Sequence, residues 1–285
     1  MFMINGKVKK VLTVMLTAVI GGTILVGCGN KVDDSTVEKI LNAKNALLEA
    51  KNLSLRNEVI TEAQGESQSY MNDAVVNNDT SEWYGAMGNV TNGNMAIFNE
   101  ILILPDGMYS RFQGEEWQTG TKDDRQVIYG LDNISNIELD SKDCKEVKET
   151  KVGDNTVFSI STTKDYTKKV KKETVKTMEK LMEEYKNNPN AIPEAIDSDM
   201  SNFEAVKKTN YKEINYIFTI DEAGVLIGYE NSFVIEQPEV IPSKNGKFEL
   251  GEKMIELKMT NNIIINSYND EKNVEFINKL KEEVK

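Results

Sequence analysis

The sequence contains no histidine, and this absence excludes several kinds of chemistry. Without histidine the chain cannot assemble a Ser-His-Asp triad, a Cys-His pair or a histidine-ligated zinc site. The sequence also shows no other pairing of a nucleophile with a base and no cluster with the spacing of metal ligands. We therefore expect a protein that is not an enzyme and that holds neither a metal ion nor a cofactor.

Cysteine is almost absent too, since the chain has only Cys28 and Cys144. If the Cys28 thiol is covalently modified, no disulfide can form within the chain. The folded part must then be stabilised by its hydrophobic core. Cys144 lies among charged residues, with no histidine or second cysteine to activate it. We expect it at a strand edge or in a loop, as an unreactive thiol.

Basic residues are outnumbered by acidic ones, with 34 Lys and Arg against 46 Asp and Glu and a net charge of −12. An acidic surface of this kind repels the phosphates of nucleic acid. We therefore expect no nucleic-acid partner.

A long hydrophobic run lies near the N-terminus, from Val11 to Val26, and directly follows Lys7, Lys9 and Lys10. A basic segment followed by an apolar segment that ends in small residues is typical of a secretory signal. At about 1.5 Å per residue, the run is short for a hydrocarbon core of about 30 Å. An uncleaved membrane anchor is therefore the weaker alternative.

The end of the hydrophobic run resembles the lipobox of bacterial lipoproteins, which here would be Leu25-Val26-Gly27-Cys28. The resemblance implies that the Cys28 thiol receives a diacylglyceryl group and that cleavage makes Cys28 the first residue. Residues 1–27 would then be the signal peptide.

The segment 28–34 would be the lipidated cysteine with a short polar tether. Two acyl chains give stable anchoring, and a tether of this length spans at most about 20 Å. We expect the folded part to lie close to the extracytoplasmic face of the cell membrane. The membrane is then a binding partner of the protein through the lipid anchor.

Residues 35–285 contain no internal repeat, linker or break in composition, and we expect a single domain. Ser35 and Glu38 form a capping-box pattern, which predicts a helix from Ser35 to about Asn52. Alternation of apolar and polar residues, with turn residues between, then predicts a series of strands. Their expected ranges are Leu53–Ala63, Ser67–Val76, Ser81–Val90, Met95–Leu104 and Met108–Phe112, with a further strand starting at Trp117.

The second half of the chain is predicted to start with an ambiguous segment, Asp123–Asn136, either a short helix or an irregular crossing. A hairpin of Cys144–Lys151 and Thr156–Thr163 follows. A helical insertion is expected at about 165–208, with a long helix to about Lys186 and a short one over Asp199–Lys208. The remaining expected elements are four strands, Tyr211–Ile220, Val225–Gln237, Lys247–Met259 and Asn262–Tyr268, and a closing helix, Val274–Val284.

The segment Asn99–Trp117 carries a resemblance to a known group of proteins. Two isoleucines are followed by an Asp-Gly turn, then Met108 and Tyr109, then Gly114 and Trp117. In this pattern and in its order of elements, the chain resembles the LolA/LolB-like superfamily, which includes mycobacterial-type lipid-carrier lipoproteins. It is most similar to Gram-positive lipoproteins of unassigned function in that group.

The resemblance implies an α+β fold, in which a strongly curved antiparallel β-sheet forms an open half-barrel with helices packed across its concave face. It implies that an acyl chain can be held between sheet and helices, and it supplies no catalytic residues.

Two groups of residues are candidate sites. The first is a possible lining for a hydrophobic ligand, with ordinary core packing as the alternative; it consists of Met95, Ile97, Tyr109, Phe112, Trp117, Met178 and Met182. The second is a possible contact with an anionic surface, with a solvated helix face as the alternative; it consists of Lys168, Lys169, Lys172 and Lys176.

Three functions are compatible with these features to different degrees. The first is binding of a lipid or other hydrophobic molecule in the half-barrel. The second is a protein-interaction or regulatory module at the cell surface, with a filled core and no ligand. A transporter's substrate-binding protein is less favoured, because it requires alternating helices and strands.

Overall fold

The computed structural model describes residues 32–91, 94–120, 131–186, 203–242 and 248–284. The expected signal peptide 1–27, the lipobox with Cys28 and most of the tether 28–34 lie outside the described residues. The same holds for residues 187–202 of the helical insertion.

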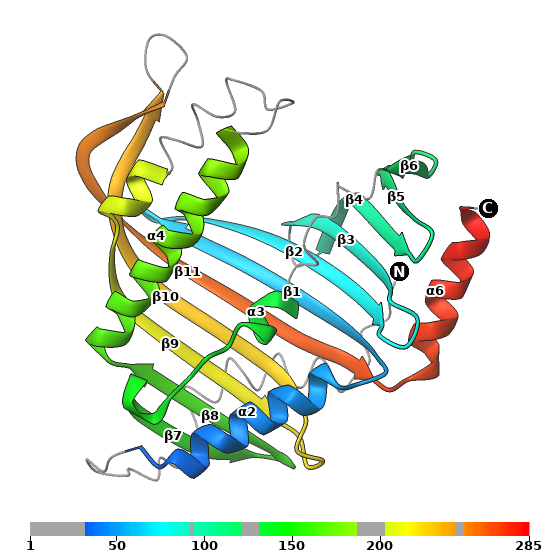
Figure 1. The fold of residues 1–285 in the computed structure, drawn as a ribbon, viewed down its shortest axis with the longest axis horizontal. Coiled ribbons are helices and arrows are strands. Elements are labelled where there is room, and N and C mark those ends of the chain that lie inside the picture. Colours follow the sequence, from blue (N-terminus) through cyan, green and yellow to red (C-terminus); the bar gives the residue numbers. More distant parts are fainter. Residues whose placement is uncertain (1–31, 92–93, 121–130, 187–202, 243–247, 285) are drawn as a thin grey trace.

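Among the described residues, eleven strands form one antiparallel sheet with the order β6-β5-β4-β3-β2-β1-β11-β10-β9-β8-β7 (Figure 1). The first strand therefore pairs with the last, at the middle of the sheet. The two ends of this order, β6 and β7, do not pair with each other, so the sheet stays open. The strands are β1 (Asn52–Ala63), β2 (Glu66–Asn77), β3 (Glu82–Thr91), β4 (Asn94–Leu104), β5 (Gly107–Phe112), β6 (Gln118–Gly120), β7 (Cys144–Val152), β8 (Asn155–Thr162), β9 (Asn210–Ile220), β10 (Leu226–Pro242) and β11 (Phe248–Tyr268).

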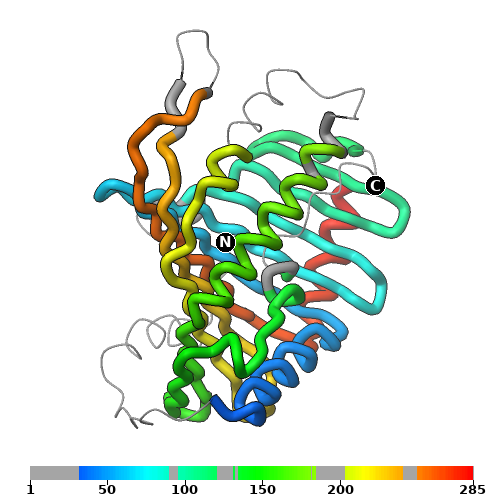
Figure 2. Tube along the Cα trace, turned by 60° about the vertical axis from the view of Figure 1, so that its left-hand side comes forward, coloured from blue at the N-terminus to red at the C-terminus, as the bar shows by residue number. Residues whose placement is uncertain are grey.

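The sheet curves around three helices on its concave face, α2 (Asp34–Leu48), α3 (Leu131–Ser135) and α4 (Lys164–Lys186) (Figure 2). A fourth helix, α6 (Glu271–Glu283), packs against β1, β2 and β3 on the opposite, convex face. The expected α+β open half-barrel is confirmed, and α6 adds a helix on the side where none was expected.

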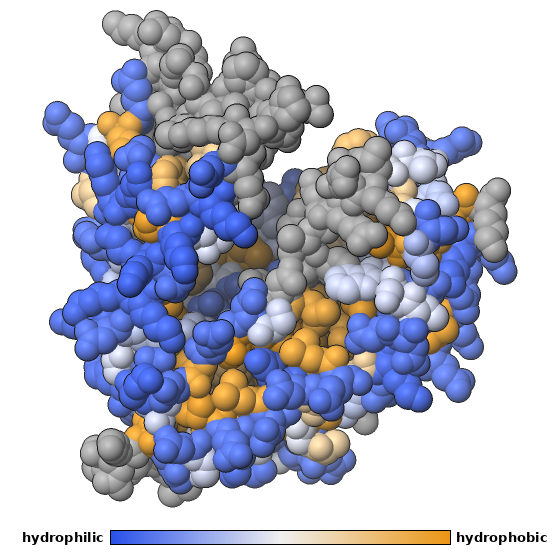
Figure 3. Space-filling model, in the orientation of Figure 1, coloured by the Kyte–Doolittle hydropathy of each residue, from blue (hydrophilic) through white to orange (hydrophobic). Residues whose placement is uncertain are grey.

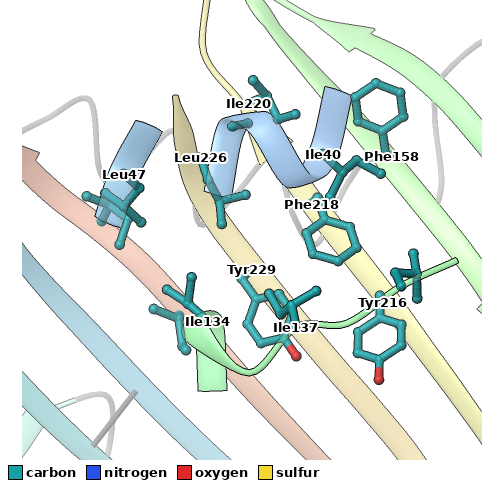
Figure 4. Packing of buried hydrophobic residues seen from close by; sticks show 14 of the residues in the cluster. Ile40, Leu47, Ile134, Ile137, Phe158, Tyr216, Phe218, Ile220, Leu226 and Tyr229 are labelled. Atoms are coloured by element: carbon teal, nitrogen blue, oxygen red, sulfur yellow. The ribbon is translucent and has the colours of Figure 1, made fainter. Parts of the chain in front are cut away.

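The main core lies between α2, α3 and the concave face of the sheet (Figure 4). Ile40 and Leu47 of α2 are completely buried against strand residues that include Phe218 and Leu226. Ile134 of α3 is buried in the same cluster. A fully buried aliphatic side chain contributes about 1.5–3 kcal/mol. This cluster therefore fixes α2 and α3 to one end of the concave face.

A second, smaller core holds α6 on the convex face. Ile277 and Leu280 of α6 pack with Val75, Tyr84 and Leu102 of strands β2, β3 and β4. Val75 lies between Ala74 and Val76, which both belong to the main core. Successive strand residues point to opposite faces, so the two cores occupy the two sides of one sheet.

The first helix begins earlier than predicted. Asp33, and not Ser35, is the N-cap, because its side chain accepts a hydrogen bond from the backbone N–H of Ser35 at 3.1 Å. The helix also ends at Leu48, before the expected Asn52. The capping-box pattern predicts Ser35 as the N-cap, and this prediction is wrong, because an Asp two residues earlier satisfies a helix N–H group in the same way.

The last two predicted strands are one continuous strand, β11, and the expected break near Asn261 is wrong. Thr260, Asn261 and Asn262 each pair with β1 on one side and with β10 on the other. Backbone hydrogen bonds from both neighbours keep this polar segment extended, where its composition indicated a turn. The ambiguous segment Asp123–Asn136 contains α3, and its first part lies outside the described residues.

Candidate functional site: the concave face of the sheet

Two rows of side chains form the floor of the concave face, across the middle of the sheet. In an antiparallel sheet, directly paired residues lie on the same face. The first row runs through Tyr216, Asn231, Asn261, Val59 and Tyr70 of strands β9, β10, β11, β1 and β2.

The second row lies two residues along each strand, towards α2. It runs through Phe218, Tyr229, Ile263, Asn57 and Asn72 of the same five strands. Phe218, Tyr229 and Ile263 belong to the main core beneath α2 and α3. Neither row contains a charged side chain.

The helices cover the concave face unevenly. The main core joins α2 and α3 to one end of the sheet, and α4 packs on β9. Figure 3 shows a hollow in this face beside α4, with apolar side chains gathered along its margin. We call this space the concave hollow. Half-buried apolar side chains on the concave face of the neighbouring strands are Val59, Met87, Phe233 and Met259.

Four asparagines on this floor have carbonyl oxygens that lack a hydrogen-bond donor. They form two directly paired couples, Asn57 with Asn72 and Asn231 with Asn261. The Oδ1 atom of each is buried, and no donor among the described residues reaches it. We call these four residues the asparagine seam. Buried polar atoms without a partner are uncommon in folded proteins, so four of them together on one floor call for an explanation.

Tyrosine hydroxyls border the seam. The hydroxyl groups of Tyr166 on α4 and Tyr216 on β9 lie 2.9 Å apart and share a hydrogen bond. Burial raises the pKa of Tyr216 and of Tyr229 well above the usual tyrosine value. Both side chains therefore stay neutral at any physiological pH, and the floor of the hollow is polar without being charged.

The seven predicted lining residues do not gather on one surface. Ile97, Tyr109 and Trp117 pack against the convex core under α6. Phe112 is 62 % exposed near the end of β5. Met182 is buried and Met178 half-buried, both on α4. The side chain of Met95 lies outside the described residues.

The convex position of Tyr109 and Trp117 follows from a network around Arg111. The Arg111 guanidinium donates to the Glu100 carboxylate at 2.6 Å and lies 4.3 Å from the centre of the Trp117 ring. The Tyr84 hydroxyl donates to the same carboxylate at 2.6 Å. Burial would raise the pKa of Glu100, but these hydrogen bonds outweigh it and hold the pKa below its usual value.

Glu283 on α6 joins this network by accepting hydrogen bonds from Arg111 and from the Trp117 indole N–H, both at 3.3 Å. The network thereby links the C-terminal helix to β4 and β5. Tyr109 and Trp117, two of the aromatic residues singled out in the sequence, thus pack with α6.

Three of the four predicted surface lysines lie together. Lys168, Lys172 and Lys176 line a shallow pocket of about 530 Å³ along α4, and Lys171 and Lys207 complete its basic rim. Lys207 comes from a short helix whose described part covers residues 203–208. The sequence pattern predicts this helix over Asp199–Lys208.

The fourth predicted lysine, Lys169, points elsewhere. Its Nζ lies 3.6 Å from an Asp143 carboxylate oxygen and 5.9 Å from the centre of the Tyr166 ring. It lines a different pocket, of about 410 Å³, which also includes Leu41 and Lys44 of α2. The basic surface is therefore made of the other lysines.

Cys144 begins the edge strand β7 but is buried there. Burial, with the nearby Asp143 and Asp140 charges, raises the pKa of the thiol to about 11. A thiol with so high a pKa is a poor nucleophile at neutral pH. The described part of the chain also shows no cluster of metal-binding side chains and no helix with the length and apolarity needed to cross a membrane.

No protein-family model matches the chain, and no curated protein matches it in sequence. Solved structures do match. Lipoprotein LppX of Mycobacterium tuberculosis is 10 % identical with a TM-score of 0.35, and the match covers 84 % of this chain and 97 % of LppX.

A LolA superfamily protein of Nitrosomonas europaea is 7 % identical with a TM-score of 0.25, over 80 % of this chain and 90 % of that protein. A domain from Vibrio parahaemolyticus, described as an outer membrane lipoprotein-sorting protein, is 8 % identical with a TM-score of 0.24, over 83 % and 92 % of the two chains. These matched structures thus include a lipoprotein, a LolA superfamily protein and a lipoprotein-sorting domain, and the matches transfer no function to this chain.

Proposed function

We propose that the chain is a non-enzymatic lipoprotein, anchored through Cys28 at the extracytoplasmic face of the cell membrane, that binds a hydrophobic ligand in the concave hollow. One observation carries the binding part of this proposal. Among the described residues, α2 and α3 fill one end of the concave face, and a hollow with half-buried apolar side chains along its floor lies beside α4.

The composition of the hollow fits a hydrophobic ligand. Val59, Met87 and Met259 lie on its floor strands, and Met178 lies half-buried on α4. Ligand pockets are lined mostly by apolar groups, and methionine side chains adapt to varied shapes. Burying an apolar chain there would contribute about 0.8 kcal/mol for each methylene group removed from water.

The membrane anchor is tested by replacing Cys28 with alanine in the full chain. We expect this change to abolish incorporation of labelled fatty acid and retention in the membrane fraction. Cys144→Ala is the matched control and should change neither, because that thiol is buried. Unchanged labelling and membrane retention in the Cys28→Ala variant would refute the anchor.

Ligand binding is tested by native mass spectrometry of the full chain, purified from its host membrane in mild detergent. We expect a co-purified hydrophobic molecule that Val59→Trp displaces, because the larger side chain fills the hollow. Ile60→Trp changes the neighbouring residue on the convex face and should retain the ligand.

A ligand-free mass for the unmodified chain in every preparation would contradict the proposal. That outcome would favour the alternative, a protein-interaction or regulatory module whose concave face is filled and whose partner would be found by cross-linking at the membrane.

A further inference from the structure

The asparagine seam requires an explanation that the apolar hollow does not give. Asn57 is 2 % exposed and Asn72 is 7 % exposed, and the two are directly paired between β1 and β2. Both side-chain Oδ1 atoms are buried without a donor among the described residues. A buried carbonyl oxygen without a donor destabilises the folded chain, so its presence points to a partner that supplies the donor.

The second couple of the seam extends the same surface. Asn261 is paired with Val59, two residues from Asn57 on β1. Residues in this relation are diagonal neighbours on one face of a sheet, within reach of a single small group. Asn231 continues the row on β10. The four acceptors therefore form one continuous polar strip beside the apolar floor of the hollow.

The charge of the strip limits what can bind to it. A phosphate or carboxylate presents only acceptors and therefore cannot donate a hydrogen bond to the unpaired oxygens of the seam. A buried ammonium group would need a carboxylate as counter-charge, and neither floor row contains one. Hydroxyl and amide N–H groups are uncharged donors and satisfy both conditions.

We propose that the ligand is an amphiphile with an uncharged head that carries hydroxyl or amide N–H donors, which the asparagine seam binds. Its apolar chain lies along the hollow, over Val59 and Met259. This inference rests on the proposed function and adds the chemical class of the ligand to it.

The test uses the full chain in phosphatidylcholine vesicles that contain one of two photoactivatable probes with the same acyl chain. One probe is a monoacylglycerol, whose head carries two free hydroxyl groups, and the other is the fatty-acid methyl ester, which has no donor. We expect labelling of the protein by the first probe to exceed labelling by the second about tenfold, since one or two added hydrogen bonds are worth that factor.

The Asn57→Leu, Asn72→Leu double variant should lose this preference and still be labelled by the methyl ester, which also shows that it is folded. Asn262→Leu is the matched control. Asn262 also has an unpaired buried Oδ1, but its pairing with Glu58 and Glu230 places it on the convex face. This control should keep the tenfold preference.

The outcomes separate the inference from the proposed function. Equal labelling by both probes in the unmodified chain would overturn the donor-bearing head while leaving a hydrophobic ligand in place. A preference that survives in the double variant would overturn its assignment to Asn57 and Asn72. No labelling by either probe would overturn the proposed function itself.

Discussion

Replacing Asn57 and Asn72 with leucine should stabilise the ligand-free protein. Each substitution removes a buried carbonyl oxygen that has no donor among the described residues. Leaving such a group unsatisfied costs about 1–3 kcal/mol, and leucine has a similar size and gains from burial. We expect the free energy of unfolding to rise by about 1–3 kcal/mol for each site. In a domain of this size, about 1 kcal/mol corresponds to 2–4 °C in Tm.

The measurement is urea and thermal unfolding of residues 32–285, followed by near-ultraviolet circular dichroism for each single variant and for the pair. Asn89→Leu is the control, because Asn89 is an exposed residue of β3 in the same sheet. Its effect should stay within about 0.5 kcal/mol. If leucine at Asn57 or Asn72 destabilises the protein without a ligand, both amides already have partners and the reasoning about the seam fails.

Three further predictions follow from other parts of the molecule. Changing Lys168, Lys172 and Lys176 to glutamate should remove salt-sensitive binding of residues 32–285 to anionic vesicles, a loss of about 1 kcal/mol per lysine; equal binding of the unmodified protein to neutral and anionic vesicles would contradict this. Cys144 should resist alkylation at pH 8 until urea unfolds the chain, because its pKa is raised to about 11; fast reaction in the native state would show that the thiol is accessible. Glu100→Gln should lower the free energy of unfolding at pH 7 and make that free energy fall less below about pH 5. A carboxylate whose pKa is lowered in the folded state stabilises the fold above its unfolded-state pKa of about 4.3, and this contribution is lost as the pH falls through the folded-state pKa. An unchanged loss of stability in acid would show that other groups cause the acid sensitivity.

The strands were largely predictable because period-two alternation and turn residues are local signals. Every end of the ranges predicted for the first five strands lies within one residue of the end observed in β1–β5. The exception near Asn261 arose because pairing with strands far along the chain overrides the local preference of asparagine for turns. The expected half-barrel followed from the resemblance carried by Asn99–Trp117.

The candidate site was less predictable, because a strand pattern shows alternation without telling which face meets which helix. Tyr109 and Trp117 were grouped with Met178, yet the sheet separates the former pair from the latter. The register across β1, β2, β10 and β11 places four asparagines together from segments far apart in the sequence. The available signal was the presence of asparagine in otherwise strand-like segments, such as Asn57 between Leu55 and Val59.

The pairing of β1 with β11 has a consequence for how the protein is made. Leu53 lies opposite Tyr268, so the centre of the sheet joins segments from nearly opposite ends of the chain. Contacts so distant in sequence form slowly, because a long loop must close first. A chain delivered across a membrane from its N-terminus keeps β1 without this neighbour until the last strand has emerged. Its exposed edge would be open to pairing with other chains during that interval, so export of the kind proposed for this chain would be coupled to folding through this strand pair.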